Sequence, residues 1–173
     1  KSNAKAMFKE ASEMDFDMTI KEKALLNYAK VACETSSAYN EPLKAFQTFT
    51  EQFPNSDKAN EAKEYLAQLY GEMKNYRDAI EMIEQMSERN LSVNKAYQRL
   101  CLNRAIELFN ENRTDDALIY LDKSLSQTHD NSLTAAAYYL KAEAYHQMGE
   151  YELSIKNLNT FYSVPGADKS QFV

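Results

Sequence analysis

The 173-residue sequence predicts an all-α protein built as an array of helical hairpins. Only three glycines and three prolines interrupt the chain, which favours long regular elements. Apolar residues recur at intervals of three and four, as they do on one face of an α-helix. The same hairpin pattern returns at Tyr39, Tyr76, Thr114 and Tyr151, which are 37, 38 and 37 residues apart. Such a period is typical of repeat proteins, in which each unit packs on its neighbours.

Two columns of small residues keep this register. The column in the first helix of each hairpin is Ala29, Ala67, Ala105 and Ala142. The column at the start of each second helix is Pro42, Ala79, Ala117 and Ser154. The interval between the columns is 12 residues in the last three hairpins and 13 in the first, which predicts an inserted residue near Ser36 and Ser37. Small side chains at both positions predict that the two helices of each hairpin approach closely.

The elements follow from this register in chain order. A half-repeat at residues 4–17 comes first, because Phe8 and Ala11 match the inner face of a second helix with no first helix before them. The repeats then follow at residues 21–54, 57–90, 93–127 and 132–163, and residues 164–173 start the next junction. We therefore expect an internal fragment of a longer protein, which begins in mid-repeat and ends between repeats.

Residues at the expected helix ends support these boundaries. The side-chain oxygen of Asp17 or Thr19 is expected to cap the first helix of the first repeat, and that of Asn40 the second. Pro54 ends the second helix, because a proline disfavours helical geometry at the residue before it. Gly149 ends the first helix of the last repeat, because glycine adopts a left-handed conformation without a Cβ clash.

The last hairpin, over residues 134–162, resembles a tetratricopeptide repeat. Its helices carry the small residues Ala142 and Ser154, a Gly149-Glu150-Tyr151 turn joins them, and aromatic residues lie on the second helix. The resemblance implies a right-handed superhelical solenoid of such hairpins, in one continuous array over residues 1–173. It also implies a non-catalytic scaffold that binds a protein or peptide on its concave face.

Residues 40–86 carry a narrower resemblance. Two phenylalanines on a second helix, Phe46 and Phe49, precede Phe53-Pro54-Asn55-Ser56 and an Ala-x-x-Ala-x-x-x-Leu helix. This order is similar to repeats of bacterial envelope proteins, including the outer-membrane assembly lipoprotein, the Tol-associated periplasmic protein and large multi-repeat relatives. The resemblance implies a periplasmic or outer-membrane-associated protein. A cytoplasmic regulatory module of a multidomain protein and a structural self-association segment remain alternatives.

Composition excludes several other classes of function. The net charge of −6 disfavours nucleic acid, which needs a basic face. No apolar run approaches the roughly 18 residues of a membrane span. Neither His129 nor His146 is accompanied in the sequence by other metal ligands or by a positioned nucleophile. We therefore expect no metal site, no cofactor and no enzymatic activity. Cys33 and Cys101 are expected to be packing residues rather than a disulfide.

The outward-facing residues of the first helices are the candidate partner-binding groove. Counted from the small residues, the groove positions are Leu26, Lys30, Glu64, Gln68, Leu102, Ile106, Phe109, Tyr139, Glu143 and His146. The set on the first helix of the third repeat, Leu102, Ile106 and Phe109, is wholly apolar. Such a stripe is either part of the core or a binding patch. Our hypothesis is that a partner segment covers it, with Phe109 and Tyr139 as anchors.

The two ends of the array are the second candidate surface. Repeat proteins need polar capping repeats at their ends, and an internal fragment exposes apolar faces that its neighbours would cover. We therefore expect self-association through the first helix, around Met7, Phe8 and Ala11, or through the last helix, around Leu158 and Phe161.

Overall fold

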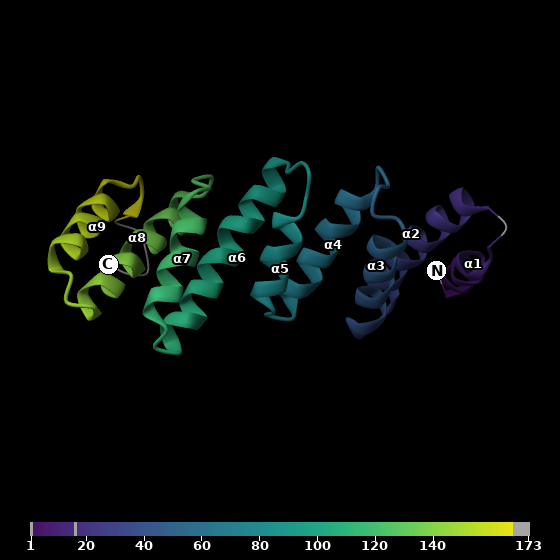
Figure 1. Ribbon diagram of the computed structural model, residues 1–173, viewed down its shortest axis with the longest axis horizontal. Coiled ribbons are helices and arrows are strands. Elements are labelled where there is room, and N and C mark those ends of the chain that lie inside the picture. Colours follow the sequence, from purple (N-terminus) through teal and green to yellow (C-terminus); the bar gives the residue numbers. More distant parts are fainter. Residues whose placement is uncertain (1, 16, 168–173) are drawn as a thin grey trace. The chain divides into compact units, whose positions relative to one another are not determined.

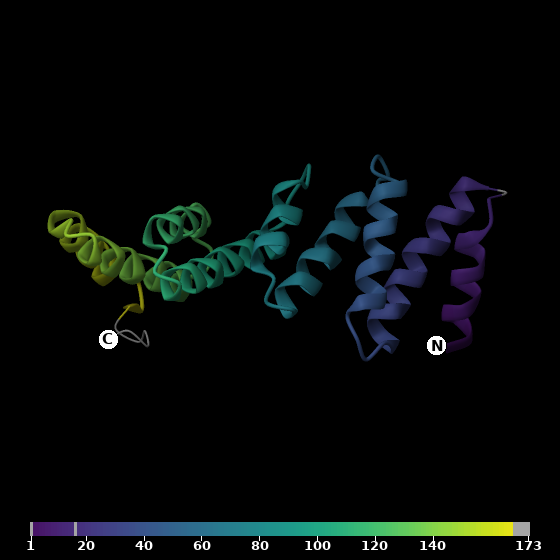
Figure 2. The same cartoon turned by 60° about the horizontal axis from the view of Figure 1, so that its bottom comes forward.

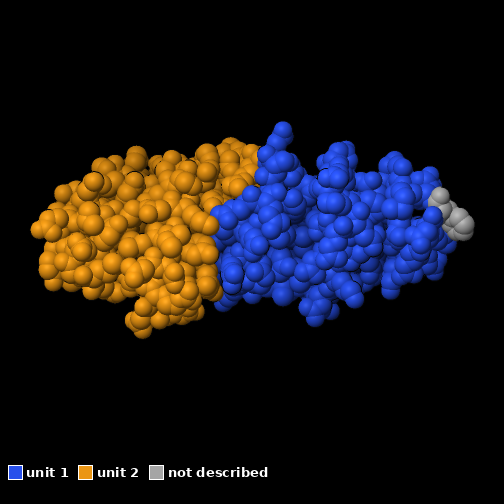
Figure 3. All heavy atoms as spheres, in the orientation of Figure 1, with its two compact units in different colours: residues 1–88 blue, residues 89–173 orange. Residues whose placement is uncertain are grey.

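The computed structural model describes residues 2–15 and 17–167. Phe16, and residues 168–173 of the predicted last junction, lie outside the described residues. The regular elements of the described part are α-helices joined by short turns (Figure 1). They group into two compact units, residues 1–88 and 89–173, which are described separately below (Figure 3). The single continuous array over residues 1–173 therefore stays a prediction.

Unit 1 is a stack of helices in chain order (Figure 1 and Figure 2). The helices are α1 (Ser2–Glu13), α2 (Met18–Thr35), α3 (Asn40–Gln52), α4 (Ala59–Glu72) and α5 (Tyr76–Glu84). Each helix packs on the next one along the chain. Phe46 and Phe49 of α3 are fully buried at the centre of the unit, together with Leu25 of α2 and Leu66 of α4. The core is thus continuous from α2 to α4.

Unit 2 contains two longer hairpins. Its helices are α6 (Leu91–Asn110), α7 (Thr114–Leu125), α8 (Asn131–Gln147) and α9 (Tyr151–Ser163). Each packs on the next, and α6 also contacts α8. One apolar cluster joins Leu102 of α6, Leu121 of α7 and Ala137 of α8. A second cluster joins Ala135 of α8 to Phe161 of α9.

The turns within the hairpins reproduce the predicted register. The helices α5, α7 and α9 begin at Tyr76, Thr114 and Tyr151, the residues from which the period was counted. Residues 36–39 separate α2 from α3, whereas the other three hairpin turns, at 73–75, 111–113 and 148–150, are one residue shorter. The inserted residue predicted near Ser36 and Ser37 is therefore confirmed.

Each of the three shorter turns contains one residue in the left-handed region. Gly149 has φ +79°, as predicted. Lys74 and Asn112 occupy the equivalent places with φ +59° each, a conformation that a non-glycine side chain adopts at some cost. The sequence pattern did not reveal these two positions, because neither residue is the glycine that usually marks such a turn.

The observed helix caps include one correction. The Asp17 side chain accepts hydrogen bonds from the N–H groups of Thr19 and Ile20, at 2.8 and 3.3 Å, as one of the two predicted alternatives. The prediction for Asn40 is wrong, because Asn40 is the first residue of α3 and Tyr39 holds the cap position without a side-chain bond. The side chain that ties down this helix start is instead Glu41, described below.

All eight small residues of the two columns are buried. Ala29, Ala79 and Ala117 are 0% exposed, and Ala105 is 1% exposed. Side chains of this size leave no room for additional atoms without moving a helix, which supports the predicted close approach within each hairpin.

Replacing Ala105 by leucine is expected to lower the free energy of unfolding by about 1–3 kcal/mol, because the added atoms overpack the seam of the α6–α7 hairpin. Urea denaturation followed by circular dichroism measures the change. Ala96→Leu on the exposed side of the same helix is the matched control, and its effect should stay within about 0.5 kcal/mol. An unchanged midpoint for Ala105→Leu would show that the register of this hairpin is misassigned.

Gln98 of α6 is a buried polar residue with every side-chain group bonded. It is 0% exposed. Its Nε2 donates to the Asp130 carbonyl at 3.2 Å and to the Thr134 hydroxyl at 3.0 Å, and its Oε1 accepts from the Asp130 N–H at 3.0 Å. Its own carbonyl accepts from the Ser124 hydroxyl at 2.9 Å. Gln98 therefore ties α6 to the end of α7 and to the loop that leads into α8.

The same position in the other repeats has a related role. The residues seven before the small residue of each first helix are Glu22, Asn60, Gln98 and Ala135. Glu22 accepts from the Ser56 hydroxyl, and Asn60 donates to the Ser87 hydroxyl at 3.0 Å. In both pairs, as for Gln98, the partner lies in the loop that follows the same hairpin. Ala135 makes an apolar version of this contact with Phe161 and the segment after α9. We call this column the loop tether.

Candidate functional site

The predicted groove positions of unit 1 are mostly polar. Lys30 of α2 forms an ion pair with Glu61 of α4 at 2.5 Å, and Gln68 donates to Glu72 at 3.0 Å. Gln68 also lines a depression of about 260 Å³ between the end of α2 and α4. The charge of Lys30 is therefore compensated within the unit. Glu64, another predicted position, is half-buried.

Leu26 does not belong to this groove. It is only 7% exposed and packs with Leu25 and Phe46 in the core of unit 1. The core cluster that includes Leu26 combines residues of α2, α3 and α4, so the apolar stripe of α2 is wider than the single face assumed when the groove positions were counted. The prediction for Leu26 is corrected accordingly.

The free thiol of Cys33 lines the same depression as Gln68. Burial raises the pKa of this thiol, and the carboxylates of Glu72 and Glu34 raise the pKa further. Cys33 is therefore a neutral side chain at neutral pH rather than a reactive thiolate. Cys101 is buried, and neither thiol belongs to a disulfide, so both cysteines are packing residues, as predicted.

Leu102 is the second correction to the predicted groove. It is 4% exposed and lies in the cluster with Leu121, Ala136 and Ala137. Because α8 packs against α6 as well as against α7, the side of α6 that carries Leu102 meets another helix instead of an open hollow. Leu102 is a core residue.

The remaining groove positions of unit 2 form what we call the α6–α8 face. Its members are Ile106, Phe109, Tyr139, Glu143 and His146. Ile106 and Phe109 are half-buried on α6, and Tyr139 and Glu143 are half-buried on α8. The Tyr139 ring meets the buried Phe161 ring edge-on, with centroids 5.8 Å apart. The exposed His146 ring meets that of Tyr151 in the same way at 5.6 Å. Ile106, Phe109, Tyr139 and Glu143 are thus partly exposed and His146 is exposed, and their use as one binding surface stays a prediction.

The chemistry of the α6–α8 face suits noncovalent contacts. In the part of the chain that the structure describes, no three histidine, cysteine or acidic side chains are grouped so that they could hold a metal ion. A helix long and apolar enough to span a membrane is likewise absent from the described residues.

The predicted self-association surface also changes in detail. Phe161 is 1% exposed and belongs to the core between α8 and α9, so it cannot contact another molecule. The exposed large apolar residues of α9 are instead Tyr151 at 58%, Leu153 at 39%, Ile155 at 58% and Tyr162 at 70%. Met7 on α1 is 70% exposed, as the prediction required.

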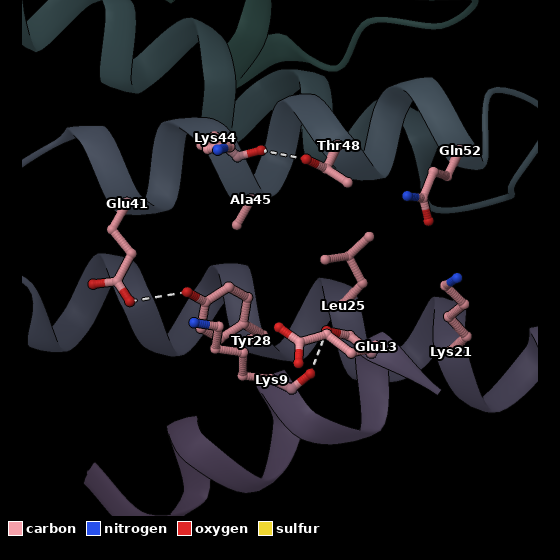
Figure 4. Close-up of a pocket in the computed structure, with 11 residues that line it drawn as sticks. Lys9, Glu13, Lys21, Leu25, Tyr28, Glu41, Lys44, Ala45, Thr48 and Gln52 are labelled. Atoms are coloured by element: carbon pink, nitrogen blue, oxygen red, sulfur yellow. Dashed lines mark hydrogen bonds between the residues drawn. The ribbon is translucent and has the colours of Figure 1, made fainter. Parts of the chain in front are cut away.

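A polar network in unit 1 joins three helices around Glu41, and Figure 4 shows its bond with Tyr28. The Glu41 carboxylate accepts from Lys5 of α1 at 2.7 Å, from the hydroxyl of Tyr28 of α2 at 2.9 Å, and from the hydroxyl of Ser36. Hydrogen bonds from Lys5 and Ser36 lower the pKa of Glu41 to about 2. Burial, followed by the bond to Glu41, raises the pKa of Tyr28 to about 12.

The stability of unit 1 is expected to depend on pH through this network. The pKa of Glu41 is lower in the folded state than its ordinary 4.5. The stabilisation that ionised Glu41 gives to the folded state is therefore complete above pH 4.5 and is lost as the pH falls toward about 2. The raised pKa of Tyr28 has the opposite dependence on pH. The stabilisation that the protonated Tyr28 hydroxyl provides is lost as the pH rises from 10 toward about 12. Because the Glu41 side chain is 38% exposed, solvent screening limits its share to about 1 kcal/mol.

Thermal melts between pH 7 and pH 3 measure this effect on the acid side. Glu41→Gln should lower the stability at neutral pH and flatten the acid limb of the stability profile. Glu51→Gln, on the exposed surface of α3, should leave the profile of the parent protein unchanged. Equal acid limbs for Glu41→Gln and the parent would contradict the role of the network.

Comparison with known proteins addresses the last hairpin directly. Residues 135–164 match the tetratricopeptide repeat family. This span covers most of α8 and all of α9, the hairpin on which the resemblance was based. No curated protein matches the sequence.

Solved structures extend the comparison to nearly the whole chain. A crystal structure of MamA is 17% identical, with a TM-score of 0.54, over 95% of this chain and 88% of that chain. Another MamA structure is 18% identical, with a TM-score of 0.52, over 94% and 90%. The structure of BtubC from P. vanneervenii is 13% identical, with a TM-score of 0.51, over 97% and 72%. The predicted all-α fold, a solenoid of tetratricopeptide-like hairpins, is thereby confirmed.

Proposed function

We propose that this protein is a non-catalytic scaffold that binds a protein or peptide on the α6–α8 face. The observation that supports the proposal is the partial exposure of Ile106, Phe109 and Tyr139 on two neighbouring first helices. The first helices of helical repeats line the surface on which such proteins bind their partners. A partner side chain that covers Phe109 would bury apolar area that the unit itself leaves in contact with water.

Phe109 is the better of the two predicted anchors for a test. Truncating Tyr139 would also remove its contact with the buried Phe161, so a loss of binding could reflect a loss of stability. Phe109 is half-buried, and its truncation should leave the helices intact. Binding anchors at the centre of an interface commonly contribute about 2 kcal/mol, which corresponds to roughly a 30-fold change in affinity.

Phe109→Ala is therefore expected to weaken the complex with the natural partner about 30-fold while the helical content stays the same. The partner is captured by crosslinking in the source cells, identified by mass spectrometry, and titrated by calorimetry. Ile119→Ala is the matched control, since Ile119 is 55% exposed on α7, outside the α6–α8 face. A Phe109→Ala protein that binds as tightly as the parent, or that unfolds before binding can be separated, would overturn the proposal.

We further propose that the scaffold acts in the bacterial cell envelope, in the periplasm or at the outer membrane. The support is the similarity of residues 40–86, with Phe46, Phe49 and the Phe53-Pro54-Asn55-Ser56 junction, to envelope repeats. Fractionation of the source cells, with an antibody raised against this chain, tests the location. Recovery in the cytoplasmic fraction would favour the regulatory-module alternative instead.

Self-association is the second candidate function, and the exposed side of α9 favours it. Tyr151, Ile155 and Tyr162 are separated by four and seven residues, so they lie along one helix face. All three are more than half exposed. Sedimentation analysis over a range of concentrations decides between the candidates, because self-association requires a mass that rises with concentration.

A further inference from the structure

Helix α9, the last helix of unit 2, carries a stripe of exposed apolar side chains (Figure 1). Ile155 is 58% exposed and Tyr162 is 70% exposed, and Leu158 between them is half-buried. The three residues are three and four positions apart, so they lie on one face of the helix. Val164 and Ala167, which follow α9, pack in the core cluster of α8 and α9 and leave this stripe exposed. We call these three residues the α9 stripe.

The equivalent positions on other second helices are better covered. Counted from the small residue of each second helix, Leu158 corresponds to Phe46 of α3 and to Leu121 of α7. These two side chains are 0% and 1% exposed, whereas Leu158 is only half-buried. The two exposed positions of the α9 stripe correspond to residues that are all half-buried: Leu43 and Thr50 on α3, and Leu118 and Leu125 on α7.

The first helix of the following repeat is what covers these positions within each unit. Helix α3 contacts α4 in unit 1, and α7 contacts α8 in unit 2. The Phe46 ring stacks on the ring of Tyr65 of α4, with centroids 4.8 Å apart. Leu121 lies in one core cluster with Ala136 and Ala137 of α8. The α9 stripe therefore continues, on another second helix, the interface that α3 forms with α4 and that α7 forms with α8.

The two covering helices share a short sequence pattern. Ala62 of α4 and Ala137 of α8 are both 0% exposed. Each is followed three residues later by a large apolar side chain, Tyr65 in α4 and Leu140 in α8, which packs against the same core cluster. The small residue lets two helices approach closely, and the large residue lies on the same helix face. A helix that fits α9 is therefore expected to carry a small residue and, three positions later, a large apolar one.

We propose that the α9 stripe binds an amphipathic α-helix of a partner protein, which packs on α9 as α4 packs on α3. Its small residue would lie near Leu158, and its large apolar residue would cover area that Ile155 and Tyr162 leave in contact with water. A second copy of this chain fits less well, because α4 and α8, which carry the pattern, already pack on the helices before them. The site lies outside the α6–α8 face, so it goes beyond the binding function proposed there.

A peptide with the sequence of α4 tests the site on the whole protein. The probe is residues 56–72, acetylated, amidated and labelled with fluorescein, and its control peptide carries Ala62→Gln with Tyr65→Gln. Fluorescence anisotropy is expected to show saturable binding of the first peptide only. In the protein, Ile155→Ala with Tyr162→Ala should weaken this binding about tenfold, because the two substitutions remove apolar area that the helix would bury.

Two controls separate this site from other apolar surface and from the proposed function. Ile119→Ala with Leu153→Ala truncates two exposed apolar side chains outside the α9 stripe and should not alter binding. Phe109→Ala should not alter it either, so a failure of the α6–α8 face and a failure of the α9 site are distinguishable.

Three results with the peptides would overturn the proposal. They are the absence of saturable binding, equal binding of the control peptide, and full affinity in the Ile155 and Tyr162 variant. Sedimentation analysis adds a fourth. A mass that rises with concentration for the parent protein but not for this variant would assign the α9 stripe to a second copy instead.

Discussion

Replacing Phe46 by alanine is expected to lower the free energy of unfolding by about 3–5 kcal/mol, the largest effect of any single change considered for this protein. Phe46 is 0% exposed at the centre of unit 1. Its ring stacks on that of Tyr65 in the next hairpin, with centroids 4.8 Å apart and planes 10° from parallel. The substitution removes buried area, opens a cavity and deletes the ring contact between α3 and α4.

Guanidinium denaturation, followed by circular dichroism at a helical wavelength, measures the loss. Tyr39→Ala is the matched control, because Tyr39 precedes the same helix but is 45% exposed, and its effect should be below about 1 kcal/mol. The experiment also tests the predicted continuous array over residues 1–173. A continuous array requires one transition that moves as a whole, whereas a second transition left in its original place would show that unit 2 unfolds independently.

Replacing Gln98 by leucine is expected to cost about 3 kcal/mol, although leucine is apolar and the site is fully buried. The change leaves the N–H of Asp130 without the acceptor that it has at 3.0 Å. It also removes the donor at 3.0 Å from the Thr134 hydroxyl, which keeps its own bond to the Asp130 carbonyl. Each buried polar group left unsatisfied costs about 1–3 kcal/mol, which exceeds the gain from burying a leucine in its place. A shifted midpoint in thermal and chemical denaturation measures the loss.

A double-mutant cycle makes the Gln98 prediction specific. Thr134→Val in the Gln98→Leu protein should cost less than Thr134→Val alone, because the hydrogen bond between the two residues is already absent. Gln147→Leu, on an exposed residue at the end of α8, is the control for the change in side-chain type. Additive effects of the two buried substitutions would contradict the network.

The helices and their register could be predicted from the sequence because both depend on local patterns. The small residues Ala67, Ala105 and Ala142 recur at nearly constant intervals, and each is required by the close approach of two helices that are adjacent in the chain. The insertion near Ser36 was visible for the same reason, since it shifts one column relative to the other.

The groove was predicted less well because exposure depends on which other helices arrive. Leu26 and Leu102 have the spacing of outward-facing residues. Each nevertheless lies in a core cluster that includes residues of a helix outside its own hairpin. Contacts of this kind join residues far apart in sequence. The pair Lys5 and Glu41 is separated by 36 residues, and no local pattern marks either residue.

The loop tether restricts where residues can be inserted into a repeat of this chain. Glu22, Asn60 and Gln98 bond residues 34, 27 and 32 positions further on, so each tether closes a ring that contains nearly a whole hairpin and its exit loop. An insertion in the exit loop would displace the bonded residue, whereas one at the opposite end of the ring, in the hairpin turn, would leave the tether in place. The extra residue of the first hairpin lies at that opposite end, and Ser36 within this turn has become a partner of Glu41. Variation in repeat length is therefore expected to concentrate in the hairpin turns, where new side chains can acquire contacts without breaking the closure of the repeat.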